Sequence, residues 1–415
     1  MIMKTRNYFG TPLLLAALFI FVAPAAGHAD NLFRLYPELQ VNGFYADNVP
    51  LKTSNEIGDF GSTMVGGFYL DFTSAARYAS LHYDTFVQLF THQTQYDRAG
   101  EGQYVNLTDD ENLSPRTKLH LDELFYRDAS SAVAITTSDQ SPQFNSVMAL
   151  LLLADFQASI NQFNAQLTHY WGRNWSSELS VHQTTFWATG NNSNGNNGNN
   201  SYVQGFTAIT DYHLNDRFSL GAGNRYYDFQ FTFPGRPDQQ ADWPFLRATW
   251  QPMRNLALTG MMGVVISHAQ GTSGDQVNPA GIGTIAYQFE RGEVNMAGGQ
   301  EPELVSVYGS VGEVRYGRGS IVYDFTQRLT GTAGCGYFDF TGSGFSGDFL
   351  SWGVGLSERV NKWLSLNTRF IQVRRSETSS NQFLPSGTTS GQWAVGDYYV
   401  VGLAVSIEAF RWSWQ

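Results

Sequence analysis

Long stretches of this chain alternate apolar and polar residues with a period of two, and this alternation constrains the fold more than any other feature. Successive side chains of a β-strand point to opposite faces, so each stretch predicts a strand with one apolar and one polar face. The stretches run for about 10 to 15 residues, whereas a soluble strand has roughly 5–6 and a tilted membrane strand needs about 9–11. The clearest are 64–72, 162–168, 255–266, 350–357, 364–370 and 401–409.

Both a soluble antiparallel sheet and a transmembrane barrel show such alternation, but three features favour the barrel. These features are the length of the strands, the alternation of short turns with long polar loops, and tryptophans at segment ends, where membrane-interface girdles lie. Beyond residue 30 no apolar run reaches the roughly 20 residues of a transmembrane helix. The girdle candidates are Trp171, Trp175, Trp187, Trp250, Trp363, Trp412 and Trp414.

The predicted turns recur at regular intervals. Four of their arginines are spaced 37 residues apart, which fits one long hairpin plus one outer loop. Such a period is also typical of solenoids and propellers, although a propeller blade needs four shorter strands per repeat. The turn residues are Arg173, Arg217, Arg254, Arg291, Arg328 and Lys362.

The pattern predicts an all-β fold: a transmembrane antiparallel up-and-down barrel of about 18 strands, with 16 or 20 possible, short periplasmic turns and long extracellular loops. The apolar run 147–154 does not alternate, so its structure stays undecided between a short helix in the lumen, a strand and a loop against lipid. The predicted long loops are 92–115, 190–201, 233–242, 268–279, 298–312 and 376–396. Strand starts are expected near Phe33, Ser62, Arg77, Thr117, Ser131, Ala158, Ser177, Tyr202, Arg217, Trp243, Asn255, Ala280, Glu293, Val314, Leu329, Asp348, Lys362 and Asp397.

Residues 1–29 have the layout of a secretory signal peptide. Lys4 and Arg6 precede an apolar stretch at 13–22, and the small residues Gly27 and Ala29 fit a cleavage site. A retained N-terminal anchor is the rival interpretation. Residues 30–415 are then expected to form a single barrel domain.

With these features the mature chain resembles bacterial outer-membrane β-barrel proteins of the porin-like class, through the signal peptide, strand–turn–strand units such as 212–220, and an aromatic-ended last strand. The resemblance implies a place in the bacterial outer membrane among lipid and lipopolysaccharide, insertion by the barrel-assembly machinery, and a possible homo-oligomer. The assembly signal would be Phe410, Trp412 and Trp414, which break parity with 401–409, so we expect a bulge near Ala409. A weaker likeness, through 43–48 and the acidic hairpins, is to barrels associated with exopolysaccharide export.

Charged residues on the polar faces predict a wet lumen crossed by ion pairs. The net charge of −11 argues against nucleic-acid binding, and the acidic excess suggests a preference for cations. The predicted pore-lining residues are Asp71, His82, Asp84, Glu178, His182, Arg225, Arg318, Asp324, Arg369 and Glu408.

Three histidine–carboxylate groupings are candidates for catalysis, although lumen histidines paired with carboxylates are usually structural. They are His82 with Asp84, His120 with Asp122 and Glu123, and Glu178 with His182. None comes with an evident nucleophile, and no histidine pair has helical metal-ligand spacing. The single cysteine, Cys335, excludes an intramolecular disulfide and a thiolate cluster. We therefore expect no enzyme activity, cofactor or metal.

The predicted function is an outer-membrane porin-like channel for passive diffusion of small hydrophilic solutes or ions. The alternative is a structural or conduit barrel of an envelope export assembly, serving exopolysaccharide export or electron transfer. A barrel enzyme that uses His82 is the third hypothesis.

Overall fold

A computed structural model gives the fold of the chain. It describes residues 31–47, 58–93, 98–129, 157–189, 201–231, 238–269, 275–305, 310–342, 345–379, 393–406 and 410–414. The signal peptide, the apolar run 147–154 and Glu408 lie outside these residues, so the predictions about them stay predictions.

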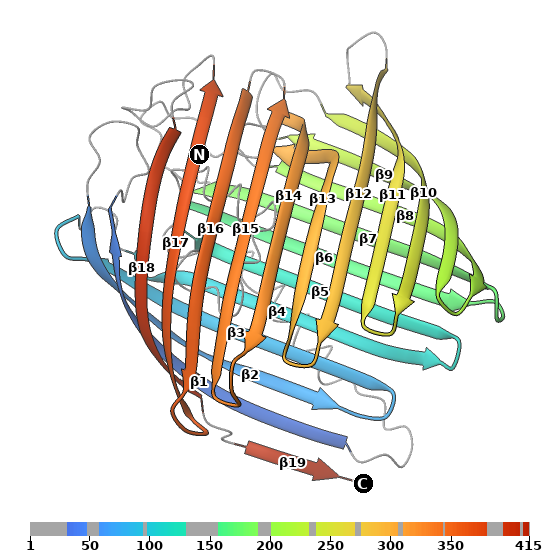
Figure 1. Cartoon of the computed structure of the whole chain (residues 1–415). Coiled ribbons are helices and arrows are strands. Elements are labelled where there is room, and N and C mark those ends of the chain that lie inside the picture. Colours follow the sequence, from blue (N-terminus) through green and yellow to red (C-terminus); the bar gives the residue numbers. More distant parts are fainter. Residues whose placement is uncertain are drawn as a thin grey trace, which may run out of the picture.

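All the described elements are β-strands, which run antiparallel to their neighbours (Figure 1). They are β1 (Asn31–Ala46), β2 (Asp59–Thr73), β3 (Arg77–Phe90), β4 (Arg98–Ser114), β5 (Thr117–Ala129), β6 (Gln157–Tyr170), β7 (Trp175–Thr189), β8 (Ser201–Asn215), β9 (Phe218–Phe231), β10 (Gln239–Met253), β11 (Leu256–Ala269), β12 (Gln276–Phe289), β13 (Gly292–Val305), β14 (Ser310–Asp324), β15 (Leu329–Gly342), β16 (Phe345–Arg359), β17 (Leu364–Ser379), β18 (Trp393–Ser406) and β19 (Phe410–Trp414). Among the described residues, no helix is long and apolar enough to cross a membrane.

The sheet closes on itself, because β1 pairs with β2 on one side and with β18 and β19 on the other. The result is a closed barrel of 18 strands, in which β18 and β19 occupy one strand position in succession. Leu35 pairs with Phe410 but Glu38 pairs with Ser406, so the last strand carries one more residue than β1 over this interval. The register shift falls across 407–409, which lie outside the described residues, so the bulge predicted near Ala409 stays a prediction. The shift lets the aromatic end of the chain stay paired with β1.

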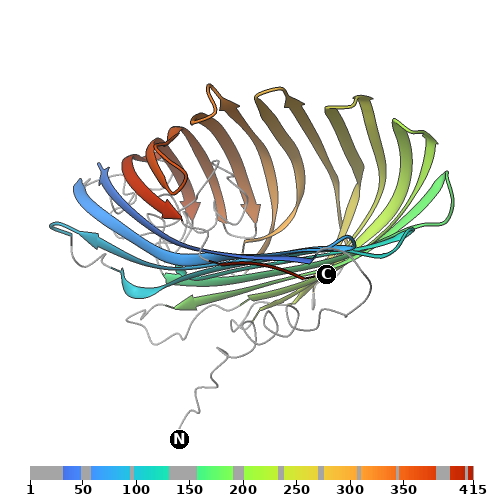
Figure 2. The same ribbon diagram turned by 90° about the horizontal axis from the view of Figure 1, so that it is seen from below.

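One contact identifies the inner face of the wall. Arg225 on β9 lies 3.8 Å from Glu301 on β13 although three strands separate them, so both side chains must project inward. The pairing registers carry this assignment to every other strand. Figure 2 shows the flattened wall of the early strands (blue to green) facing the arched wall of the later strands (yellow to red).

The opposite face carries the apolar sets of the predicted alternation. Met262 is 69% exposed, and Cys335 is exposed on this face as well. Because these side chains alternate with inward ones along each strand, the barrel presents an apolar exterior to lipid. Further examples are Leu39, Val41, Met64, Leu246, Val264, Val354, Leu356, Val401 and Leu403.

Connections of two to four residues join the hairpins at one end of the barrel, here called the short-turn end, and all six predicted turn residues lie there. Connections at the other end, the long-loop end, reach 27 residues. Seventeen of the predicted strand starts lie within four residues of an observed start.

The eighteenth predicted start, near Ser131, lies outside the described residues, and β5 pairs directly with β6 in the sheet. One observed strand has no counterpart among the predicted starts. The missing strand is β4, which occupies most of the predicted loop 92–115. Its sequence is rich in acidic residues and glycine, so its short apolar alternation around Val105 and Leu107 gave too weak a signal. The outward Asp109 of β4 is paired with Arg77 at 2.6 Å. The predicted loops 233–242, 268–279, 298–312 and 376–396 are likewise shorter than expected, because strands extend into them.

The exposed position of Met262, midway along β11, gives a test of the outward face. Replacing it by arginine (Met262→Arg) should cost about 2–4 kcal/mol, because a charge would enter lipid near the bilayer midplane. The same change at Leu256, on the same face at the end of the strand, should cost about 0–1 kcal/mol. Urea unfolding in phospholipid vesicles measures both, and equal losses would contradict a lipid-facing β11.

Candidate functional site

The interior of the barrel collects the residues predicted to line a pore. The registers place nine of the ten on the inward face; Glu408 lies outside the described residues. That they line a conducting pore stays a prediction. Phe410, Trp412 and Trp414 lie on β19, paired with β1, and their role as an assembly signal stays a prediction too.

The interior near the short-turn end is polar. A cavity of about 1250 Å³ lies there between β1–β2 and β14–β18. Asp324 accepts a hydrogen bond from Thr330 at 2.6 Å, and Arg369 also lines this space. Asp71 pairs with Arg34 at 3.6 Å on the same face. Other polar lining residues are Glu38, Gln40, Asn42, Thr332, Ser357, Ser365 and Asn367. We call this space the polar vestibule.

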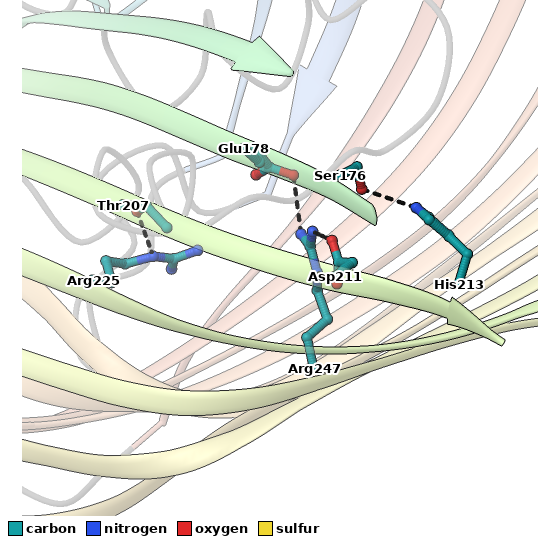
Figure 3. Close-up of polar contacts among 7 residues, drawn as sticks. All are labelled: Ser176, Glu178, Thr207, Asp211, His213, Arg225 and Arg247. Carbon is teal, nitrogen blue, oxygen red and sulfur yellow. Dashed lines mark hydrogen bonds and ion pairs between the residues drawn. The ribbon is translucent and has the colours of Figure 1, made fainter. Parts of the chain in front are cut away.

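A three-residue ion cluster lies on the opposite wall (Figure 3). Arg247 on β10 donates to Glu178 on β7 at 3.1 Å and forms a two-pronged ion pair with Asp211 on β8. All three side chains are largely buried. Bidentate pairing of this kind fixes the guanidinium orientation, so the cluster holds three strands in a defined arrangement.

Arg225 forms a second charged group that crosses the interior. Arg225 donates hydrogen bonds to Thr207 at 3.2 Å and to Tyr227 at 3.3 Å. Its guanidinium also lies over the ring of Trp243, 5.1 Å from the ring centroid. Its ion pair with Glu301 spans from β9 to β13. A smaller cavity of about 620 Å³ lies beside Arg225, and His182 and Pro302 also line it.

Toward the long-loop end the inward face is apolar, which corrects the expectation of a polar interior throughout. The inward aromatic and aliphatic side chains there are 0–7% exposed, so they form a packed layer rather than a water-lined wall. Several outward neighbours of this layer are polar, among them Asp228, Asp339 and Asp348, so the polar-in, apolar-out alternation is lost toward the long-loop end. The layer includes Phe44, Val65, Phe86, Phe186, Phe229, Trp243, Phe245, Val314, Phe338, Phe340, Phe349 and Val373.

Inward glycines let large side chains lie flat against the wall. A Cβ on Gly205 would come within 1.9 Å of the His182 ring, and a Cβ on Gly221 would come within 2.1 Å of an Asp211 oxygen. Glycine at these positions therefore seats the neighbouring side chain and keeps it out of the lumen centre.

The predicted histidine groupings behave differently from one another. His82 contacts Asp84 at 2.8 Å and also Glu38, 44 residues earlier in the chain. His120 lies between Asp110 and Asp122, while Glu123 projects outward toward Asn161. Glu178 and His182 take different partners: Glu178 pairs with Arg247, and His182 packs edge-on against Tyr227.

Among the inward charges that sequence reasoning missed are Glu38, Asp211, Arg247 and Glu301. Arg247 shares its face of β10 with the apolar residues Trp243 and Phe245. The alternation of apolar and polar residues therefore did not mark that face as polar. Glu38 alternates with Leu39 and Val41, a signal that was present but short.

Comparison with known proteins finds no matching family model and no matching curated protein. Among solved structures the chain is similar to OccK2 (OpdF) of Pseudomonas aeruginosa, with 10% identity, a TM-score of 0.44, and coverage of 91% of this chain and 98% of the other. It is similar to OpdL of the same organism (12%, TM-score 0.42, 91% and 99%) and to OccAB4 of Acinetobacter baumannii (11%, TM-score 0.42, 92% and 100%).

The glycine seats give a test of the ion cluster. Gly221→Ala should destabilise the barrel by about 1–3 kcal/mol, because the new methyl group displaces Asp211 from Arg247. Gly260→Ala is the matched control, since a Cβ there meets nothing within 4 Å. Denaturant unfolding monitored by tryptophan fluorescence compares the free energies of unfolding of the two variants. An unchanged free energy in Gly221→Ala would show that the ion cluster does not require glycine at position 221.

Proposed function

We propose that the protein is a porin-like outer-membrane channel for passive diffusion of small hydrophilic solutes or ions. The observation that carries this proposal is the polar vestibule inside a closed 18-strand barrel, because barrels of this size enclose space that water and solutes can occupy. The inner wall of the barrel bears paired charges of both signs, such as Arg34–Asp71 and Arg247–Glu178, and such groups tune the passage of ions.

The packed apolar layer determines the conductance and the solute size that we expect of the channel. We infer that this layer, together with the Arg225–Glu301 contact, restricts the lumen beyond the vestibule. Apolar constrictions hinder the passage of hydrated ions. We therefore infer a small conductance and a preference for small solutes, rather than a wide open pore.

The barrel also supports a place in the bacterial outer membrane, with the short-turn end toward the periplasm. Under this proposal the exterior contacts lipid and lipopolysaccharide, the barrel-assembly machinery inserts the chain, and residues 1–29 direct export. A homo-oligomer belongs to the same proposal.

Planar lipid bilayers provide the direct test. Folded protein should produce discrete conductance steps that scale with salt concentration. A heat-denatured sample of the same preparation is the control. Absence of steps from protein that retains heat-modifiable electrophoretic mobility would overturn the channel.

Arg247→Gln should shift ion selectivity toward cations, because Glu178 and Asp211 lose their compensating charge. One unit charge about 10 Å from a permeating ion in water changes its energy by about 0.4 kcal/mol. Opposite effects on cation and anion then raise the K⁺/Cl⁻ permeability ratio about fourfold at low salt. Reversal potentials in a KCl gradient measure the ratio. Arg247→Lys should leave it unchanged, and equal ratios in all three proteins would place the cluster outside the ion path.

A further inference from the structure

Two carboxylates from different strands converge on one nitrogen of His82. Glu38 Oε1 lies 3.1 Å from His82 Nε2, and Asp84 Oδ2 lies 2.8 Å from the same atom. The three ligand atoms all lie within 4.8 Å of one another. Glu38 comes from β1 and the other two from β3, so the strand between them, β2, must leave room for the contact.

Gly67 of β2 provides that room. It pairs with Glu38 on one side and with Asp84 on the other, so the three residues form a single row across the wall. A Cβ on Gly67 would come within 2.0 Å of Asp84 Oδ1. The absent side chain therefore leaves a recess between the two carboxylates, and the tip of the His82 ring reaches toward it.

Hydrogen bonds alone cannot satisfy both carboxylates that contact His82 Nε2. Nε2 of an imidazole carries at most one proton, which points in one direction, so it cannot donate well to two carboxylates at once. Asp84 Oδ1 is buried and has no hydrogen-bond partner among the described residues. A cation at the point of convergence would interact with all three groups.

His120 provides an internal contrast. It too lies between two carboxylates, but Asp110 contacts Nδ1 and Asp122 contacts Nε2. Each nitrogen can then carry its own proton toward its own carboxylate, which is an ordinary ion-pair arrangement. No single ion could bind all three groups there through the observed contacts.

The His82 ring is held in place and remains reachable. Tyr69 stacks on it at 3.8 Å between ring centroids, and Tyr104 contacts it edge-on at 5.1 Å. The side chains of Glu38, His82 and Asp84 are 15%, 12% and 11% exposed. Glu38 and Tyr69 also line the polar vestibule, which gives an ion a route to the site.

We propose that Glu38, His82 and Asp84 bind a divalent first-row transition-metal ion, for which Zn²⁺ is the probe. One imidazole nitrogen and two carboxylate oxygens suit such an ion, whereas Ca²⁺ and Mg²⁺ prefer oxygen ligands throughout. Zinc bonds of about 2.0–2.2 Å place tetrahedral ligand atoms about 3.3 Å apart, so the Nε2–oxygen distances need to open by only a few tenths of an ångström. The remaining coordination positions would face the vestibule and hold water.

Zinc binding to detergent-solubilised, chelator-treated protein tests the site by titration calorimetry. We expect one strong site per chain, weakened at least about tenfold in His82→Ala and in Glu38→Gln, since each removes one ligand. Gly67→Ala keeps all three ligands but fills the recess, and we expect it to weaken binding similarly. His120→Ala is the matched control and should bind as the unaltered protein does.

Three results would overturn the site: no zinc uptake by the unaltered protein, uptake unaffected by both His82→Ala and Glu38→Gln, or uptake abolished by His120→Ala alone. Heat-modifiable mobility confirms that each variant is folded, and Glu38→Gln keeps the test open should His82→Ala fail to fold. The absorption spectrum of bound Co²⁺ supplies a second measurement. None of these depends on conductance, so the site and the proposed channel succeed or fail separately.

Discussion

Closure of the sheet is the constraint on which the rest of this structure depends. Lipid offers no hydrogen-bond partners, so a spanning sheet must pair every strand edge. Here β1 completes the ring by pairing with β18 and then β19. The shift of register between Ser406 and Phe410 serves this closure, because it changes the register of the last strand and still leaves its end paired with β1. Each inward side chain takes its position from this ring of registers.

The interior combines two environments that have different physical roles. The packed apolar layer toward the long-loop end contributes burial, as a soluble core does, and Trp243 and Phe245 lie at 0% and 4% exposure within it. The polar part of the interior relies on ion pairs that cross strands, such as Glu178–Arg247 on the wall opposite the polar vestibule. An unpaired charge would be costly where these side chains are largely buried, so each charged group there needs a partner. A wall built in this way is both stabilised and polar.

Much of the fold could be predicted from the sequence, because the period-two alternation reports directly on a wall with lipid on one side. It correctly predicts the outward set around Met262 and the 18-strand barrel. It fails where that contrast is lost. β4 carries acidic residues on its outward face, with Asp109 neutralised by Arg77, and β10 is apolar on both faces from Trp243 to Leu246. The partners of inward charges were unpredictable for another reason: Arg225 and Glu301 meet only because the wall curves.

The same curvature and register explain why a cluster such as Glu38, His82 and Asp84 has no signature in the sequence. Glu38 lies 44 residues before His82, and no spacing rule relates them. They come together because β2 pairs with both neighbours so that Gly67 falls between the two carboxylates. With any other residue at position 67, the side chain would occupy the space over which Asp84 extends. The recess is therefore a property of three aligned strands, and a single glycine in the middle strand determines whether the groups on either side can act on one ligand.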